Sequence, residues 1–273
     1  MGTTRRLTQI MNITSDYSWR NYTTTRENSP LLPKNLRGLI IGKSNCGKTT
    51  LLINLLLQPE WLDYNHLFVF GKSLHQQEYK VLKKGFEEGL SKKQISNLFL
   101  KQDVLERSNI SPLDAIDEYD GIKDGEVKTN FYENSCEIPD PKELNPNEKN
   151  LLILDDCFLG PQNKAESYYT RGRHNNCDTL YISQNYFRLP RQTIRENSNF
   201  IILFPQDVRN LNHIHADHCS TDISINEFKD FCNTVWKGNK YNFVTIDLTS
   251  QPLSGKYRRN LDCFYLPGIK LDD

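Results

Sequence analysis

Short runs of apolar residues alternate with longer polar stretches along most of the chain. Several runs are only four or five residues long and almost uninterrupted, a pattern typical of strands that are covered on both faces. They lie at residues 37–41, 66–70, 151–154, 179–183 and 200–204. A final strand is predicted over 242–248.

Between these runs the apolar residues recur at helical spacing. This spacing predicts helices at residues 48–57, 74–86, 91–99, 206–217 and 224–236. The alternation of strands and helices indicates an α/β fold, in which helices flank a mostly parallel central sheet.

Three segments do not follow this alternation. Residues 1–35 are rich in Thr, Asn and Arg without any period, which predicts an N-terminal arm that becomes ordered on a partner. Residues 103–148 carry the turn signals of an acidic insertion within a domain that spans 36–250. The tail, 251–273, has no assignable pattern. No internal repeat is present.

Composition narrows the class of protein. The chain has 273 residues, of which 37% are hydrophobic and 11% aromatic, enough for a substantial core. Its seven cysteines form no C-x-x-C pair and no secretory signal opens the chain, which favours a reducing compartment with free thiols. No apolar run approaches the length of a membrane span, so we expect a soluble protein.

The charge is balanced in total but not along the chain. Lysine plus arginine and aspartate plus glutamate both number 34. Residues 103–148 contain 13 acidic and 4 basic side chains, whereas residues 161–195 contain 6 basic and 2 acidic ones. A neutral sum can therefore hide a basic face that suits a polyanion.

The segment GLIIGKSNCGKTTLLINLLL, residues 38–57, places a glycine-bounded polar loop between a strand and a helix. It fits G-x-x-x-x-G-K-[ST], in which backbone N–H groups and the positive end of the helix bind phosphates. Lys48 would reach the β- and γ-phosphates, and the Thr49 hydroxyl would bind Mg²⁺. The alternative is a glycine-rich turn without a ligand. We predict an ATP site with the nucleotide-binding residues Gly42, Lys43, Ser44, Asn45, Cys46, Gly47, Lys48, Thr49 and Thr50.

The segment LLILDDCF is a strand that delivers two carboxylates to the edge of the sheet. We expect Asp155 to bind Mg²⁺ and Asp156 to orient or deprotonate the attacking water. Taken alone, the same pattern is often a strand that runs into a turn.

Two further motifs lie close together. In TLYISQNYF, Gln184 ends a strand, where an amide can sense the γ-phosphate and position water. In YYTRGRHNN, Arg171, Arg173 and His174 form a basic loop. Either the loop is only solvated, or one of its arginines crosses to the triphosphate of a neighbouring subunit.

The segment HIHADHC could in principle bind zinc, because His215, His218 and Cys219 would share one helix face. No second pair of ligands lies at a familiar spacing. We therefore expect no metal here, and we expect the cysteines, Cys46 included, to fill space.

In four motifs the chain resembles the viral DNA-packaging ATPases of the HerA–FtsK superfamily, found in poxviruses, other large DNA viruses and Polinton elements. The motifs span about residues 36–205 and read IIGKSNCGKTTLL, LFVFGKSLHQQEY, LLILDDCF and YYTRGRHNNCDTLYISQNYFRLP. The resemblance implies a RecA-like P-loop NTPase of the additional-strand type, a ring of five or six subunits, and double-stranded DNA as the substrate that is moved.

The resemblance also implies roles for residues. Lys48 and Thr49 take the Walker A roles, Asp155 and Asp156 the Walker B roles, and Gln184 the sensor role, while Arg173 is preferred to Arg171 as the trans-acting arginine. The chain departs from the pattern at Asp156, where many relatives outside the viral branch have Glu. It departs again in the acidic insertion, which corresponds to no motif of the family.

The sequence thus predicts an ATPase that uses ATP and Mg²⁺ to move double-stranded DNA into a viral capsid. Its catalytic residues would be Lys48, Asp156, Gln184 and Arg173, and its metal ligands Thr49 and Asp155. A capsid component would be a partner, no membrane would be involved, and the protein would act in the cytoplasm or nucleus of the infected host cell or on the virion. The alternatives are a helicase or DNA-transfer pump, a non-motor phosphotransferase, and a nucleotide switch.

Overall fold

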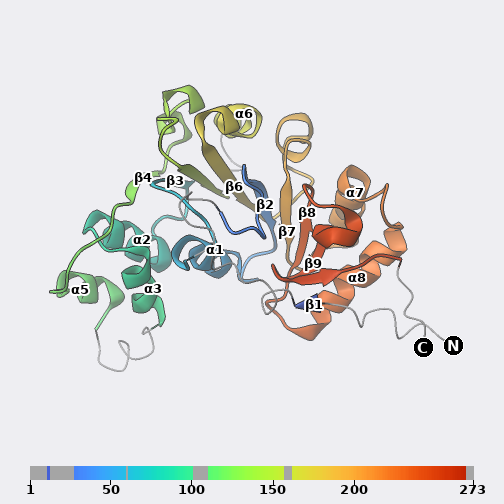
Figure 1. Ribbon diagram of the computed structural model, residues 1–273, viewed down its shortest axis with the longest axis horizontal. Coiled ribbons are helices and arrows are strands. Elements are labelled where there is room, and N and C mark those ends of the chain that lie inside the picture. The colour runs from blue at the N-terminus through green and yellow to red at the C-terminus, as the bar shows by residue number, and fades with distance from the viewer. Residues whose placement is uncertain (1–10, 13–27, 60, 101–109, 157–161, 269–273) are drawn as a thin grey trace. The chain divides into compact units, whose positions relative to one another are not determined.

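The computed structural model describes residues 11–12, 28–59, 61–100, 110–156 and 162–268 (Figure 1). The chain divides into two compact units. The terminal unit combines Met1–Lys48 with Ile182–Asp273, and the central unit is Thr49–Tyr181. Most of the predicted arm, the first part of the acidic insertion (103–109) and the end of the tail (269–273) lie outside the described residues.

Parallel strands form the sheet of the central unit. β3 (His66–Gly71) pairs in parallel with both β5 (Asn150–Asp155) and β4 (Lys128–Tyr132), so that the order is β6, β5, β3, β4. β6 runs from Cys177 to Ser183; its residues up to Tyr181 belong to the central unit, and Ile182 and Ser183 belong to the terminal unit. β5 and β6 are buried along their whole length, as their continuous apolar runs predict.

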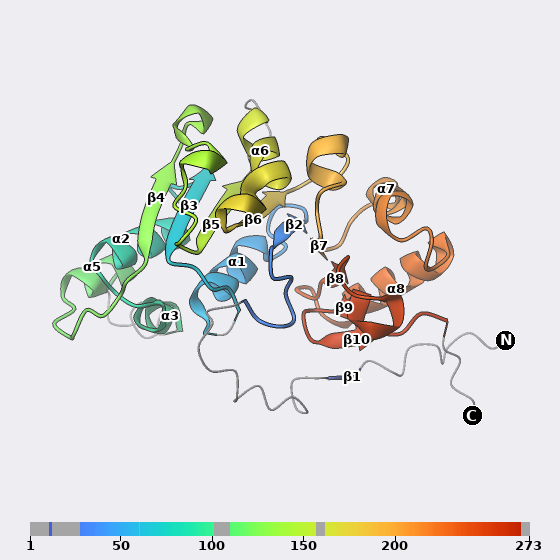
Figure 2. The same cartoon turned by 45° about the horizontal axis from the view of Figure 1, so that its top comes forward.

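Three helices correspond to the predicted ones: α1 (Lys48–Leu57), α2 (Gln77–Glu87) and α3 (Lys92–Leu100). Two helices of the central unit were not predicted, α5 (Pro112–Asp117) and α6 (Asn163–Arg171). The unit also contains the 3₁₀ turns η2 (Ser135–Glu137), η3 (Pro141–Glu143) and η5 (Gly172–Asn175). α2 packs against α3, α5 and β4, which Figures 1 and 2 show as one group.

The acidic segment is more ordered than turn signals alone suggest. Its described part contains α5, which starts with a capping box between Ser111 and Asp114, and it contains β4. β4 is the outer neighbour of β3. Its sequence, KTNFY, has no continuous apolar run because the strand is only half-buried, and the apolar pattern therefore did not reveal it.

The sheet of the terminal unit begins parallel and continues antiparallel. β2 (Arg37–Ile41) and β7 (Phe200–Leu203) are parallel, as predicted. β8 (Val244–Asp247), β9 (Tyr257–Arg259), β10 (Cys263–Tyr265) and β1 (Met11–Asn12) then follow in this order, each antiparallel to the one before. The α/β class is confirmed, but β8 is not the last strand, because the unassigned tail folds into two more.

α7 (Val208–His218) and α8 (Ile225–Gly238) complete the terminal unit, with helical turns η6 (Arg191–Arg195) and η7 (Pro252–Lys256). Figure 2 shows α8 beside β8, β9 and β10. Arg258 of β9 donates to Asp247 Oδ2 at 2.5 Å and to the carbonyl of Leu31 at 2.6 Å, both inside the unit. The tail is therefore part of the packed sheet. No helix within the described residues is long and apolar enough to cross a membrane.

Candidate nucleotide-binding site

The predicted phosphate loop connects β2 to α1. Lys43, Ser44 and Asn45 are exposed, and the backbone takes left-handed conformations at Asn45 (φ 59°) and Gly47 (φ 103°). Residues that switch between right- and left-handed conformations turn successive N–H groups toward one point, which makes a concavity for an anion. The left-handed conformations at Asn45 and Gly47 are of the kind that such concavities contain.

Gly47 has a backbone conformation that disfavours a side chain. Its positive φ strains any other residue. A methyl group there would lie 3.2 Å from Cδ1 of Tyr241 and 3.7 Å from Cε1 of Phe204. Both rings belong to the terminal unit, as does the loop up to Lys48. The backbone conformation therefore favours glycine at the second glycine of the motif, and the Tyr241 ring leaves limited room there.

Lys48 begins α1 and turns its side chain back onto the loop. Its Nζ donates to the carbonyl of Lys43 at 2.7 Å, which holds the ammonium at the loop. The first turn of α1, which includes Thr49 and Thr50, contains no acidic residue, so the positive end of the helix is not neutralised there. Thr49 is half-buried and Thr50 is exposed.

Cys46 packs within the same loop. Its Sγ lies against Gly42, where a methyl group would come within 2.5 Å of it. Partial burial raises the pKa of the Cys46 thiol, although Lys48 opposes the shift. A neutral thiol that fills space agrees with the expectation for this residue.

The structure brings Gln184 to the phosphate loop. The amide of Gly42 donates to the carbonyl of Ser183, the last residue of β6, at 3.0 Å. The Ser44 hydroxyl donates to Gln184 Oε1 at 3.3 Å, and Gln184 is exposed. All four residues belong to the terminal unit. A strand-end amide beside the loop is the arrangement that we predicted from TLYISQNYF.

Asp155 is the last residue of β5 and belongs to the central unit. Only 9% of its surface is exposed, and the Tyr79 hydroxyl of α2 donates to its Oδ2 at 2.6 Å. Tyr79 is itself 1% exposed. Gly71 of β3 is paired with Asp155. A methyl group on Gly71 would lie 3.3 Å from Asp155 Cβ.

Tyr79 is a functional candidate that the sequence analysis missed. It lies inside the quoted segment LFVFGKSLHQQEY, but its position on α2 marks it only as a buried apolar residue. Because nothing in the periodicity reveals the direction of a hydroxyl, the sequence could place Tyr79 in the core but not beside Asp155.

Asp156 leaves the strand in a left-handed conformation, with φ of 49°. Such a conformation is unfavourable for a residue with a Cβ, although Asp tolerates it better than most, and it is found more often at functional sites. The turn at Asp156 separates its half-buried side chain from the buried run of β5. Cys157 and Phe158 of the same motif lie outside the described residues.

The two candidate arginines lie on the surface of the central unit. Arg171 ends α6 and Arg173 lies in η5, with the buried Gly172 between them, and both side chains are exposed. His174 is also exposed. The structure gives no preference for either arginine within the chain.

The histidine segment of α7 has other partners. His215 Nε2 is 2.8 Å from the carbonyl of Ile223, and His218 Nε2 is 2.7 Å from the Tyr186 hydroxyl. Burial lowers the pKa of His218 to about 4, so the ring is neutral at pH 7. Within the described residues, no three His, Cys, Asp or Glu side chains are grouped so that they could hold a metal ion.

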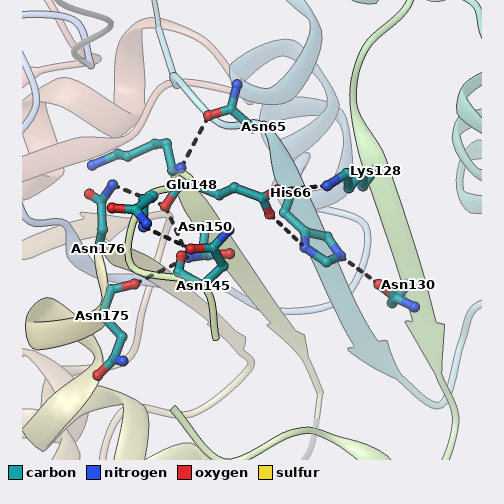
Figure 3. Close-up of polar contacts among 11 residues, drawn as sticks. Asn65, His66, Lys128, Asn130, Asn145, Glu148, Asn150, Asn175 and Asn176 are labelled. Carbon is teal, nitrogen blue, oxygen red and sulfur yellow. Dashed lines mark hydrogen bonds and ion pairs between the residues drawn. The ribbon is translucent and has the colours of Figure 1, made fainter. Parts of the chain in front are cut away.

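A second polar cluster lies at the amino ends of β3, β4 and β5 (Figure 3). Asn150, which is fully buried, donates from its amide to the carbonyls of Asn145, Glu148 and Asn175 at 2.9, 3.1 and 3.1 Å. Nearby, Lys128 Nζ lies 2.6 Å from Glu148 Oε1 and His66 Nδ1 lies 3.6 Å from Glu148 Oε2. This cluster connects loops to strands within the central unit.

Comparisons with known proteins give only distant matches. No protein-family model matches the chain, and no curated protein matches its sequence. A solved structure of the genome packaging NTPase B204 from Sulfolobus turreted icosahedral virus 2, in complex with AMPPCP, is 12% identical and has a TM-score of 0.44 over 87% of this chain and 98% of that one. VirB4 of Thermoanaerobacter pseudethanolicus is 12% identical, with a TM-score of 0.43 over 83% of this chain and 89% of that one. Likeness at this level carries no conclusion about function.

Proposed function

We propose that this protein is an ATPase that couples hydrolysis of ATP to translocation of double-stranded DNA, most specifically the packaging of a viral genome into a capsid. The observation that carries the ATPase part is the phosphate loop of the terminal unit, with Lys48 folded onto it and Gln184 bonded to Ser44 beside it. A cation and an amide at one anion-binding loop suit hydrolysis of a phosphoanhydride.

We assign the nucleotide contacts to Gly42, Lys43, Ser44, Asn45, Cys46, Gly47, Lys48, Thr49 and Thr50. Mg²⁺ would be held by the Thr49 hydroxyl and the Asp155 carboxylate, and it would neutralise phosphate charge. Mg²⁺ prefers oxygen ligands and is usually bound through one or two carboxylates together with phosphates. Asp155, whose carboxylate is fixed by the Tyr79 hydroxyl, is suited to this role.

For the chemical step, we assign Asp156 to orient and deprotonate water, Gln184 to position it near the γ-phosphate, and Lys48 to stabilise phosphate charge. Arg173 would act on the triphosphate of the next subunit in a ring of five or six. Its exposed side chain, next to the turn after α6, supports a role toward a partner.

The DNA part of the proposal rests on the order of the four motifs and on the excess of basic residues over 161–195. Lysine and arginine contacts with phosphates would make DNA binding sensitive to salt and nearly independent of sequence. The capsid as a partner and the infected host cell as the location follow from the same motifs.

ATP turnover with and without linear double-stranded DNA tests the proposal. We expect DNA to stimulate turnover, and we expect added salt to remove the stimulation. Lys48→Ala should abolish both ATP binding and turnover, whereas Lys237→Ala, which removes the same charge from an exposed position on α8, should not. If turnover depends on Lys48 but does not change with DNA, the ATPase assignment stands and the assignment as a DNA motor is refuted.

The trans-acting arginine has its own test. Asp156→Asn and Arg173→Ala should each be inactive, but a mixture of the two should regain part of the activity, because some interfaces then combine an intact Asp156 with an intact Arg173. Mixed rings that form and stay inactive would refute the assignment of Arg173.

A further inference from the structure

An aromatic ring lies open to solvent at the edge of the phosphate loop. Tyr241 is 58% exposed, yet its Cδ1 and Cε1 lie 3.2 and 3.9 Å from where a methyl group on Gly47 would be. The two residues are far apart in sequence, and both belong to the terminal unit. An exposed aromatic ring in contact with this particular glycine needs an explanation.

The backbone around Tyr241 holds the ring in this position. Tyr241 follows α8, and its amide donates to Asn239 Oδ1 at 2.9 Å. The amide of Asn242 donates to the Asn239 carbonyl at 3.1 Å, and its side chain donates to the Val235 carbonyl at 3.0 Å. These bonds fix the turn, and the ring stays 58% exposed.

Two buried aromatic residues support the loop from within. Phe204 contacts the Gly47 position and lies 5.4 Å, centroid to centroid, from Phe243 in a tilted arrangement. Phe204 is 1% exposed and Phe243 7% exposed. Because Phe204 already packs against the loop from the buried side, a third, solvent-exposed ring is not needed to bury its glycines.

The surroundings of Tyr241 suit a flat aromatic ligand. Lys240 Nζ lies over the ring, 5.2 Å from its centre, which adds a positive charge beside the π system. Asn239 Oδ1 and Asn242 Nδ2 are both engaged with the backbone, so neither of these atoms is available to the hydrogen-bonding edge of a base. What remains is a π face and a cation.

We propose that Tyr241 is the platform on which the base of the bound nucleoside triphosphate stacks, with Lys240 beside it. This inference rests on the proposed function, because the phosphates must lie in the loop for the base to reach the ring. Stacking accepts any base, since every base has a π face. The site would therefore distinguish ATP from GTP poorly.

Calorimetric titration with two probes, Mg²⁺–ATP and Mg²⁺–tripolyphosphate, tests this inference, because tripolyphosphate has the phosphates without the base. In Tyr241→Leu, which keeps bulk beside Gly47 but loses the aromatic face, we expect affinity for ATP to fall about 10-fold, within the range that stacking contributes. Affinity for GTP should fall by the same factor, and affinity for tripolyphosphate should stay unchanged.

Two further variants sharpen the result. Tyr241→Phe keeps the π face and should bind ATP as the unchanged protein does. Leu253→Ala removes a side chain that is 60% exposed elsewhere in the terminal unit, and it should affect neither probe.

Unchanged ATP affinity in Tyr241→Leu would overturn the inference. An equal loss for ATP and tripolyphosphate would also overturn it, because it would identify Tyr241 as a packing residue of the loop. Failure of the proposed function looks different: the unchanged protein would bind neither probe, or Lys48→Ala would bind both normally.

Discussion

β5 of the central unit carries polar residues at both ends, and the two ends are built differently. At the carboxyl end, Asp155 accepts the Tyr79 hydroxyl, and Asp156 turns away in a left-handed conformation. At the amino end, the buried amide of Asn150 reaches three carbonyls, and Glu148 lies between a lysine and a histidine (Figure 3).

This difference distinguishes a candidate catalytic end of the strand from an end that stabilises the fold. Polar groups at the amino end bond mainly to the backbone of neighbouring loops, which ties those loops to the sheet. At the carboxyl end, one acidic side chain is oriented by a buried hydroxyl, and the next acidic residue keeps a strained backbone. Substitutions at the amino end should therefore change the stability of the fold, and substitutions at the carboxyl end should change activity.

The largest effect is expected for Asp156→Asn. The change keeps the size of the side chain but removes the base, so hydrolysis should fall about 10²–10⁴-fold. ATP binding and the melting temperature should remain close to those of the unchanged protein. The check is turnover together with ATP titration and a melting curve. A large loss of stability instead would mean that Asp156 belongs with the structural end.

Tyr79→Phe should have the next largest effect on activity. It removes the hydroxyl that fixes Asp155, and partners of metal ligands typically contribute about 10–100-fold to metal affinity or activity. The Mg²⁺ concentration that gives half-maximal turnover should therefore rise.

Tyr64→Phe is the matched control for Tyr79→Phe. Its buried hydroxyl donates to the Leu56 carbonyl at 2.7 Å in the same unit. It should lose a similar hydrogen bond without any change in Mg²⁺ dependence. If both variants shift the Mg²⁺ dependence alike, Tyr79 has no special relation to Asp155.

Asn150→Ala tests the opposite end of β5. Loss of the buried amide leaves three partly buried carbonyls without their donor, which should lower the free energy of unfolding by about 1–3 kcal/mol. Turnover of the folded protein should not change. Denaturant unfolding measures the loss, and Asn145→Ala, at an exposed position of the same cluster, should cost much less. A clear fall in turnover at low temperature would remove the distinction between the two ends.

The smallest effect is expected for Lys128→Met. The Lys128 ammonium holds the pKa of Glu148 below its ordinary value, with a smaller contribution from His66. A lowered carboxylate pKa stabilises the fold at pH values above the ordinary pKa, and this stabilisation is lost as the pH falls through the lowered value. The melting temperature of the variant should therefore be slightly lower at pH 7, and the difference from the unchanged protein should vanish in acid. Lys142→Met, an exposed lysine of η3, should show no such pH dependence.

The sequence predicted the parts of the molecule that depend on local pattern. β2 and α1 begin and end at the expected residues. A buried parallel strand and an apolar helix each have a clear hydrophobic pattern, and the loop between them is marked by its glycines. Gln184 was expected at the end of a strand, where its amide could sense the γ-phosphate. It follows β6 directly and accepts from the Ser44 hydroxyl, while its role stays a prediction.

Other parts could not be predicted in this way. β9 and β10 are short and gain stability from pairing with their neighbours in the sheet, so they have little pattern of their own. The contacts of Tyr79 with Asp155 and of Tyr241 with Gly47 join residues that are far apart in sequence. Such contacts depend on tertiary packing, which the hydrophobic pattern of the sequence does not reveal.

The division of the chain has a consequence for the order in which the protein folds during synthesis. The central unit is one continuous stretch, whereas the terminal unit joins Met1–Lys48 to Ile182–Asp273. A ribosome that releases the chain from its N-terminus delivers β2 and the phosphate loop early, but β7, Phe204 and Tyr241 late. The early segment must wait for these partners while the whole central unit is synthesised. Competence to bind a nucleotide would thus be acquired toward the end of translation, after the central unit has had time to form.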